Sequence, residues 1–223
     1  ALTMPGVIAV HTAADLGLTD RQPAMKTYPK AMARPFLARD RVRFVGEPVA
    51  VVLAEDPYRA ADAAEVVWVD VEPLKAVVDL TESLEAETLL FESLENNVCI
   101  EKSASRVIDF DECEVVVEAD LVNSRVAAVS IEARTITASY EDGRLTCWAS
   151  SQGAHPHRQD VAKALDIEAE EIRVIVTDIG GGFGAKGMAS EEEIVVSHLA
   201  RLHERPVRWT ATRTEKLIGY VHG

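Results

Sequence analysis

The stretch Gly180-Gly181-Gly182-Phe183-Gly184-Ala185-Lys186-Gly187 decides the fold, because it joins a strand-like run to a helical pattern. Residues 172–176 predict a buried strand, and Ser190 with Glu193 has the spacing of a capping box at a helix start. Glycine lets backbone N–H groups converge on a ligand that no Cβ atom obstructs. The turn therefore indicates a site for phosphates or electron-rich oxygens, with a crowded turn that binds nothing as the alternative.

Nucleotide-binding patterns fit this turn only in part. A P-loop is excluded, because Lys186 is followed by Gly187 rather than by serine or threonine. The spacing Gly182-x-Gly184-x-x-Gly187 does match the dinucleotide-binding pattern. A nicotinamide-dinucleotide-binding module built on residues 172–212 is therefore an alternative reading of the sequence.

Two features weaken the dinucleotide alternative. Thr210, Ala211 and Thr212 stand at the end of the next strand-like run, where that motif places an acidic residue. Residues 191–193 are three glutamates on the first helical turn, and their charges would repel a pyrophosphate. A helix start favours acidic residues without any ligand, so these carboxylates are not interpreted as a catalytic pair.

Strand and helix patterns surround the turn. Asp142-Gly143 predicts a tight hairpin, since both central positions of the turn need positive φ. Helices are predicted at 13–17, from Asp56 to 64, from Pro156 to about Leu165, and from Ser190, the last with an apolar face of Val195, Leu199 and Leu202. The predicted strands are residues 7–10, 49–54, 66–71, 115–117, 135–140, 145–148, 172–176 and 207–210.

Two stretches have no clear pattern. Residues 19–41 carry three prolines and no period, so this long loop is expected to be either functional or poorly ordered. Residues 80–112 are acidic and are interpreted as a linker or a solvated surface segment. We therefore place a domain boundary in this second stretch.

Composition excludes several classes of partner. Acidic residues number 37 against 23 basic ones, so the formal net charge is −14, which disfavours nucleic acid and anionic membranes. No apolar run approaches the ~20 residues that span a bilayer. Cys99, Cys113 and Cys147 form no Cys-x-x-Cys pair, which argues against a disulfide framework, a zinc finger or iron–sulfur ligation. A reducing, cytoplasmic location is expected.

Residues 173–186 closely resemble the molybdenum-binding subunit of the xanthine dehydrogenase, aldehyde oxidase and aerobic carbon monoxide dehydrogenase family. Two segments, 42–50 and 60–64, are similar to the α/β hammerhead domain of that family. Further similarities to its molybdenum-binding domain follow in family order at residues 131–134, 148–152 and 205–209.

The resemblance implies an α+β fold in two parts. A partial, N-terminally truncated α/β hammerhead domain would occupy residues 1–80, followed by an acidic linker at 81–112. The first part of the molybdopterin-binding domain would occupy residues 113–223. Because Ala1 and Gly223 both adjoin structural elements, the chain is expected to be a piece of a longer polypeptide.

Cofactor-binding roles carry over from the family to Gln152, Gly181, Gly182, Phe183 and Gly184. Gln152 would hydrogen-bond an oxygen ligand of the molybdenum, and Phe183 would offer its backbone N–H to the metal's oxygen ligands. No direct metal ligand and no catalytic residue is expected in this chain, because the family's general-base glutamate has no match in it. From the residues alone, Gln152 is interpreted as a polar loop residue after a strand. Phe183 is interpreted as a core-packing residue, a role compatible with ligand binding by its backbone.

The implied reaction is oxidative hydroxylation of a small substrate with water as the oxygen source. The implied cofactor is molybdopterin with molybdenum, in its cytosine dinucleotide form. The implied partners are an iron–sulfur subunit, an FAD subunit and the rest of the molybdenum subunit. Gly187 stands where purine-oxidising members carry a glutamate, which leaves aldehydes, N-heterocycles and carbon monoxide as substrate classes.

Other residues give weaker signals. His155 and His157 make a poor metal pair without further ligands, and His198 and His203 do not share a helix face. Lys186 is expected either near a ligand anion or in solvent. A non-catalytic scaffold that keeps the fold and binds no cofactor is the third hypothesis.

Overall fold

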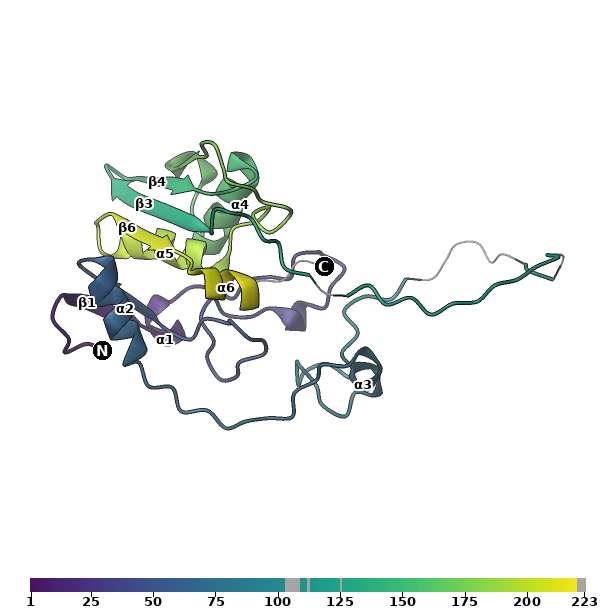
Figure 1. Ribbon diagram of the computed structural model, residues 1–223. Coiled ribbons are helices and arrows are strands. Elements are labelled where there is room, and N and C mark those ends of the chain that lie inside the picture. The colour runs from purple at the N-terminus through teal and green to yellow at the C-terminus, as the bar shows by residue number, and fades with distance from the viewer. Residues whose placement is uncertain (103–108, 112, 125, 220–223) are drawn as a thin grey trace.

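The computed structural model describes residues 1–102, 109–111, 113–124 and 126–219, and it contains two β-sheets (Figure 1). The strands are β1 (Val7–His11), β2 (Val51–Ala54), β3 (Thr135–Glu141), β4 (Arg144–Ala149), β5 (Ile172–Ile175) and β6 (Val207–Thr210). The α-helices are α1 (Ala13–Leu16), α2 (Pro57–Glu65), α3 (Leu80–Glu85), α4 (Ala154–Leu165), α5 (Glu191–Leu202) and α6 (Arg213–Ile218). Two short 3₁₀ helices, Lys30–Met32 and Ala169–Glu171, complete the set. This mixture of helix and sheet confirms the α+β expectation.

The larger sheet has the order β5-β4-β3-β6. Strands β3 and β4 form the predicted antiparallel hairpin, and its turn residues Asp142 and Gly143 have φ of 50° and 78°. Strand β5 runs parallel to β4, whereas β6 is antiparallel to β3. Ile136 on β3 and Leu145 and Cys147 on β4 are fully buried. One face of the hairpin is therefore the centre of the core.

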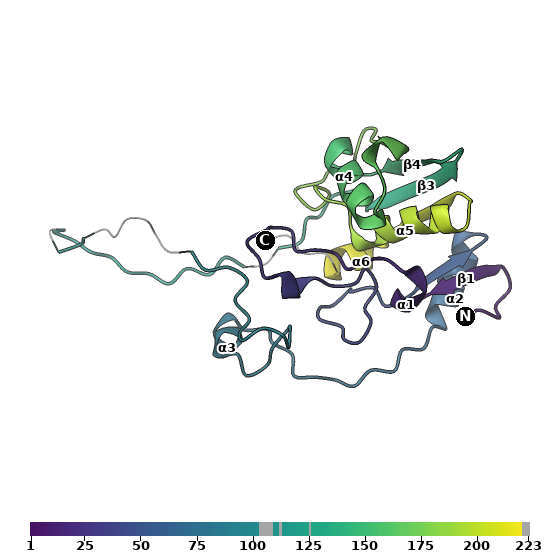
Figure 2. The same ribbon diagram turned by 180° about the vertical axis from the view of Figure 1, so that it is seen from behind.

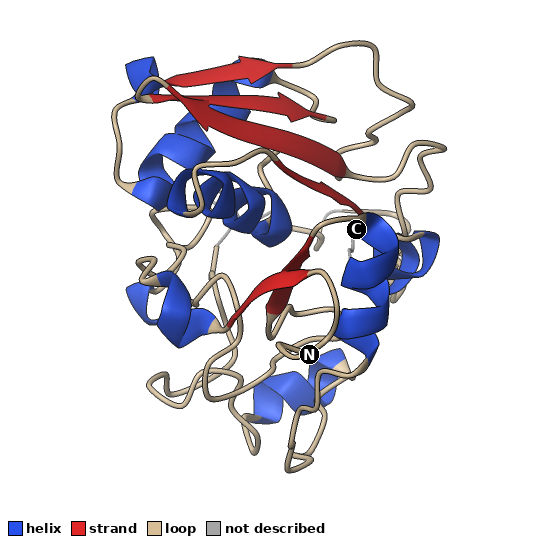
Figure 3. Cartoon of the chain, turned by 90° about the vertical axis from the view of Figure 1, so that its left-hand side faces the viewer, coloured by secondary structure: helices blue, strands red, loops and turns tan. Residues whose placement is uncertain are grey.

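Helix α5 lies between the four-stranded sheet and the β1–β2 pair (Figure 2, Figure 3). It packs on β3, β4 and β6 with Ile194, Val195 and Leu199, all nearly inaccessible to solvent. The prediction that Leu202 belongs to this face is wrong, because Leu202 ends the helix and its side chain is 49% exposed. Leu16 and Leu53 from the N-terminal part join the same apolar cluster, so the two sheets share one core.

The strand order contradicts the dinucleotide-binding alternative. A dinucleotide-binding unit places the strands before and after its helix side by side in a parallel pair. Here β5 and β6 flank α5 in sequence, but β4 and β3 separate them in the sheet. Residues 172–212 therefore do not form that unit.

The three glutamates at the start of α5 all interact with other groups of the protein. Glu191 forms ion pairs with Arg21 and Arg34, and Glu192 pairs with Arg134. Burial raises the pKa of Glu191, but Arg21 and Arg34 lower it further, so that this pKa lies below its ordinary value. The helix start thus has no room for a pyrophosphate, as its acidic sequence indicated.

The N-terminal part is built on the antiparallel β1–β2 pair, against which α2 packs. Asp56 caps α2 as predicted, accepting hydrogen bonds from the N–H groups of Tyr58 and Arg59. The stretch 19–41 is anchored near its end, where Phe36 and Leu37 are buried in the core, while residues 24–27 are exposed.

Two strand predictions are wrong. Residues 66–71 and 115–117 pair with no strand among the described residues, and Trp68 and Val117 are 88% and 84% exposed. Figure 1 shows the chain around 115–117 running away from the body. β-Branched residues favour a strand only where a neighbouring strand and a buried face are available.

Smaller differences concern helix starts and the linker. Helix α4 begins at Ala154 rather than at Pro156, and α3 lies at the start of the acidic stretch. Residues 103–108 and 112 of the expected linker, and 220–223 of the last expected domain, lie outside the described residues. The division at 80 and 112 therefore stays a prediction. No helix in the described ranges is long and apolar enough to cross a bilayer.

The α5 cap generates a prediction about pH. Glu193 is 3% exposed and accepts a hydrogen bond from the Ser190 N–H, and burial raises its pKa from 4.5 to about 7. The folded state thus binds this proton more tightly than the unfolded state, so stability falls as pH rises from 4.5 to 7. Glu193→Gln keeps the capping acceptor without the charge. It should raise the free energy of unfolding at pH 8 by up to roughly 3 kcal/mol.

Denaturant unfolding at pH 8 and pH 5 measures this effect. The gain should shrink towards zero at pH 5, where Glu193 is protonated in the folded protein. The exposed Glu170 provides the control variant Glu170→Gln, which should change neither value. An equal gain at both pH values would contradict the proton linkage.

Candidate functional site

The glycine-rich turn leaves the end of β5 and reaches the start of α5 through left-handed backbone. Gly181, Phe183 and Gly184 have φ of 93°, 50° and 88°. Two tight turns follow each other, in which the Ala185 N–H donates to Gly182 O and the Gly187 N–H to Gly184 O. Glycine accepts positive φ without strain, whereas Phe183 pays about 1–2 kcal/mol for it. Gly182 interrupts these left-handed residues, and alternation of left-handed with other backbone conformations is the geometry of anion-binding nests.

The amides of the turn are free to bind a ligand. Within the described part of the chain, the N–H groups of residues 181–184 donate to no protein acceptor. The Phe183 side chain is 66% exposed, so the reading of Phe183 as a core residue is wrong. The turn therefore offers backbone donors at the surface.

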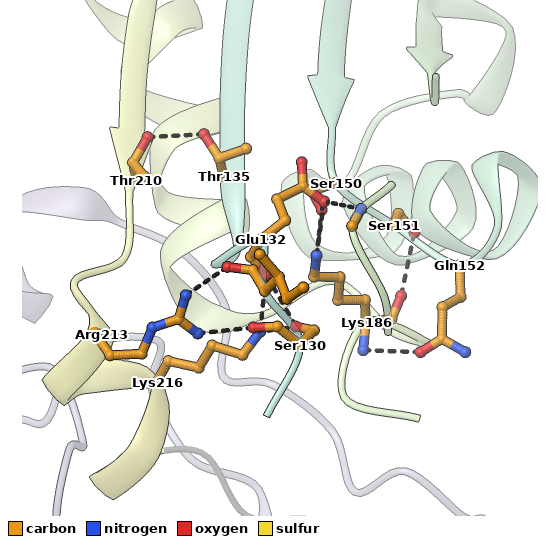
Figure 4. Close-up of polar contacts among 12 residues, drawn as sticks. Ser130, Glu132, Thr135, Ser150, Ser151, Gln152, Lys186, Thr210, Arg213 and Lys216 are labelled. Carbon is orange, nitrogen blue, oxygen red and sulfur yellow. Dashed lines mark hydrogen bonds and ion pairs between the residues drawn. The ribbon is translucent and has the colours of Figure 1, made fainter. Parts of the chain in front are cut away.

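Gln152 lies directly against this turn. Its backbone N–H donates to Lys186 O at 2.8 Å, and its Oε1 accepts from the Lys186 N–H at 3.1 Å. A Cβ atom on Gly182 would lie 2.6 Å from three side-chain atoms of Gln152, so only glycine allows this approach. Figure 4 shows the amide oxygen facing Lys186 while the amide nitrogen faces away from it. Gln152 therefore adds a side-chain donor beside the backbone donors, and the five predicted site residues lie close together.

Lys186 anchors the turn from inside the protein. It is 2% exposed, and its Nζ donates to Glu132 Oε2 at 2.9 Å and to Ser150 Oγ at 2.7 Å (Figure 4). The expectation of a solvated lysine is therefore wrong. The anion beside Lys186 is a carboxylate of the chain itself.

Glu132 is the functional-site residue that reading the sequence missed. Its Oε2 also accepts from the Gly180 N–H and the Ser150 hydroxyl. Burial raises the pKa of Glu132, but hydrogen bonds from Lys186, Ser150 and Gly180 lower it further, so that it lies below its ordinary value. The one available signal was Lys186 inside an apolar turn, since a buried lysine needs an anionic partner.

A second cationic layer holds the segment that carries Glu132. Lys216 and Arg213, both from α6, donate to the single backbone oxygen of Ser130, and Lys216 also donates to Glu132 O. Burial, followed by the charges of Lys186, Arg213 and Arg134, lowers the pKa of Lys216. The site therefore rests on α6, a helix that the sequence patterns did not reveal.

The remaining candidates do not form a metal site. His155 is exposed, whereas His157 is buried and burial lowers its pKa to about 4. In the described ranges no group of three or more His, Cys, Asp or Glu residues could hold a metal ion. His203 contacts His11 rather than His198, and Cys147 is a buried core residue as expected.

The donor set determines which group fits the site. Free backbone N–H groups and a primary amide bind oxygen atoms and anions without supplying a metal ligand, a nucleophile or a base. Phe183 and Gly184 are exposed, so the donors at this end of the turn are accessible to an oxygen-rich group. A group that brings its own metal ligands and presents oxygen atoms to the turn fits these donors.

Two family models match the chain. Residues 1–75 match the "aldehyde oxidase and xanthine dehydrogenase, a/b hammerhead domain", and residues 90–223 match the "molybdopterin cofactor-binding domain". The second match alone covers more than half of the chain. Both models agree with the resemblance stated from the motifs.

Similar proteins agree with the family models. The nicotine 6-hydroxylase large subunit of Paenarthrobacter nicotinovorans is 35% identical over 100% of this chain and 28% of its own length. The gamma subunit of the 6-hydroxypseudooxynicotine dehydrogenase complex from the same organism is 36% identical over 85% of this chain and 24% of its own. The structure of quinoline 2-oxidoreductase from Pseudomonas putida 86 superposes with a TM-score of 0.86 at 33% identity, covering 96% of this chain and 28% of that one.

The chain thus spans about a quarter of the length of these relatives. The turn, its free amides and Gln152 all lie in the segment that the molybdopterin model covers. The chain belongs to the aldehyde oxidase and xanthine dehydrogenase family of molybdopterin-binding proteins.

Proposed function

We propose that this chain forms one wall of the molybdopterin site in a molybdenum hydroxylase. The carrying observation is that four consecutive backbone N–H groups and the Gln152 amide lie together without protein acceptors. This set lies inside the domain that matches the molybdopterin model. Gln152, Gly181, Gly182, Phe183 and Gly184 are the proposed cofactor-binding residues.

The proposed roles follow from the donors. Gln152 Nε2 and the Phe183 N–H donate to oxygen ligands of the molybdenum, and the glycines lie against the pterin. Because Lys186 holds Gln152 Oε1, the amide can turn only its nitrogen toward the ligand. When bound, the cofactor supplies two-electron oxidation of a substrate carbon with water as the oxygen source.

The substrate we propose is a small nitrogen heterocycle. Two relatives carry the names of nicotine-degrading enzymes, and the similar solved structure acts on quinoline by its title. Gly187 also replaces the glutamate that purine-oxidising members are expected to carry. Aldehydes and carbon monoxide are the alternative substrate classes, and a turnover assay with each of the three distinguishes them.

The electron path is proposed to continue outside this chain. Cys99 and Cys113 are exposed and Cys147 is buried, and none belongs to a candidate metal cluster within the described residues. We therefore propose that iron–sulfur clusters and FAD lie on partner subunits. The cytosine dinucleotide form of the cofactor and a cytoplasmic location are further parts of the proposal. A domain division at residues 80 and 112 belongs to the same proposal.

Metal analysis of the intact protein tests the function directly. Purified protein should contain molybdenum and a pterin in near-stoichiometric amounts and should oxidise an N-heterocycle. Protein that folds and joins its partners without either component would support the scaffold hypothesis instead.

Replacing the side-chain donor tests the proposed role of Gln152. Gln152→Ala should reduce turnover by about 10- to 100-fold, because it removes a hydrogen bond to a metal ligand. The melting temperature should hardly change, since Gln152 is exposed. Gln159→Ala, on the exposed face of α4, is the matched control and should keep full turnover. Equal turnover of both variants would refute the role.

Adding one methyl group tests the close approach at the turn. Gly182→Ala places a Cβ 2.6 Å from Gln152 side-chain atoms, so it should displace that side chain and lower the molybdenum content. Gly187→Ala is the milder change in the same turn, because its Cβ would meet Gly184 O at 3.3 Å, a tight contact that a small shift relieves, and would not meet Gln152. Metal content of the two purified variants gives the comparison; equal loss in both would contradict the specific contact.

A further inference from the structure

We propose that Glu132 and Lys186 are positioning residues, whose ion pair holds the glycine turn and Gln152 in their ligand-binding arrangement. The inference rests on the proposed function and extends it to two residues that need not touch the cofactor. It starts from a geometric fact: one carboxylate oxygen joins the two ends of the turn.

The two ends of the turn meet at Glu132 Oε2. The Gly180 N–H, just before the four free amides, donates to this oxygen at 2.8 Å. Lys186 Nζ, just after them, donates to the same oxygen at 2.9 Å. The Ser150 hydroxyl gives the third hydrogen bond at 2.7 Å and accepts one from Lys186. The Glu132 carboxylate thus links the start of the turn to its end. We call Glu132, Lys186 and Ser150 the carboxylate clasp.

The carboxylate clasp also fixes the orientation of the Gln152 side-chain amide. The backbone of Lys186 exchanges two hydrogen bonds with Gln152, one to its main chain and one to its side-chain oxygen. The Lys186 side chain is 2% exposed, so moving this residue would leave an unpaired buried charge. The position of Lys186, and with it the donor end of Gln152, therefore depends on Glu132.

Glu132 is itself held from behind. Lys216 donates to Glu132 O at 2.9 Å, and Arg213 Nη1 donates to Ser130 O at 2.7 Å. The Glu132 N–H adds a bond to Gly180 O at 3.2 Å. A carboxylate on such a fixed backbone can determine where the turn lies.

An ion pair is better suited to placing the turn than to stabilising the fold. Apolar side chains of similar volume often stabilise a protein at least as well as a buried ion pair. The ion pair adds direction, because its donors must meet one oxygen atom. A second pair, Arg134–Glu192, joins the same segment to α5. Among the described residues, Glu192 forms no ion pair or side-chain hydrogen bond with residues 180–187. This second pair provides a matched comparison.

The variants are Glu132→Gln, Lys186→Met and the control Glu192→Gln, made in the intact protein. Glu132→Gln leaves Lys186 buried without a counter-charge, which is expected to lower the stability of the folded protein. Lys186→Met avoids this problem, because the Glu132 side chain is 34% exposed and can be hydrated. Each variant is first matched to the parent protein in melting temperature and assembly.

Hydrogen–deuterium exchange measures how firmly the turn is held, and this measurement does not depend on cofactor chemistry. The amides of Gln152 and Lys186 are hydrogen-bonded in the turn, but neither donates to Glu132. Both variants of the pair should speed exchange in peptides 150–153 and 180–187 by roughly 10- to 100-fold. Peptides of β3 and β4 should be unaffected, and so should all these peptides in Glu192→Gln. Parent-like exchange at Gln152 and Lys186 in Lys186→Met would overturn the proposal.

Molybdenum and pterin content per polypeptide gives the second readout. Both pair variants should lose about tenfold in content, whereas Glu192→Gln should retain it. Faster exchange with full cofactor content would also overturn the positioning role. A parent protein without molybdenum and pterin would instead refute the proposed function, and the exchange data would still decide whether the pair holds the turn.

Discussion

The arrangement of the site depends on one oxygen atom, Glu132 Oε2. Three donors converge on it, and two of them belong to the start and the end of the glycine turn. Without this acceptor, Lys186 would be a buried cation without a counter-charge, and both ends of the turn from Gly180 to Lys186 would lose a hydrogen bond. A single carboxylate therefore compensates a charge and determines the shape of the turn.

The start of α5 explains why the glycine turn does not form a nicotinamide-dinucleotide site of the usual kind. Helix N-termini bind phosphate when their N–H groups and positive dipole end are free. In this chain Ser190 and Glu193 cap α5, while Glu191 and Glu192 are paired with arginines. Binding capacity therefore lies in the amides upstream of the helix. The glycine spacing of a nicotinamide-dinucleotide motif is therefore present without the structure that binds such a dinucleotide.

Local chemistry made several elements predictable. The Asp142-Gly143 turn and the caps at Asp56 and Ser190 depend on residues at most three positions apart, and all three appear as predicted. Strands 66–71 and 115–117 failed for the opposite reason. Their composition favours extended chain, but pairing depends on a neighbouring strand that the segment itself cannot supply.

By itself, the sequence determined the strand–turn–helix order, the position of the glycines and the family to which they belong, because these are encoded in short contiguous motifs. Only the tertiary structure decided that Lys186 is buried against Glu132 and that Gln152 turns its nitrogen outward. The partners in these contacts lie 34 to 54 residues apart. No local pattern encodes such a contact; it arises only when β3, β4 and the turn after β5 meet around one core.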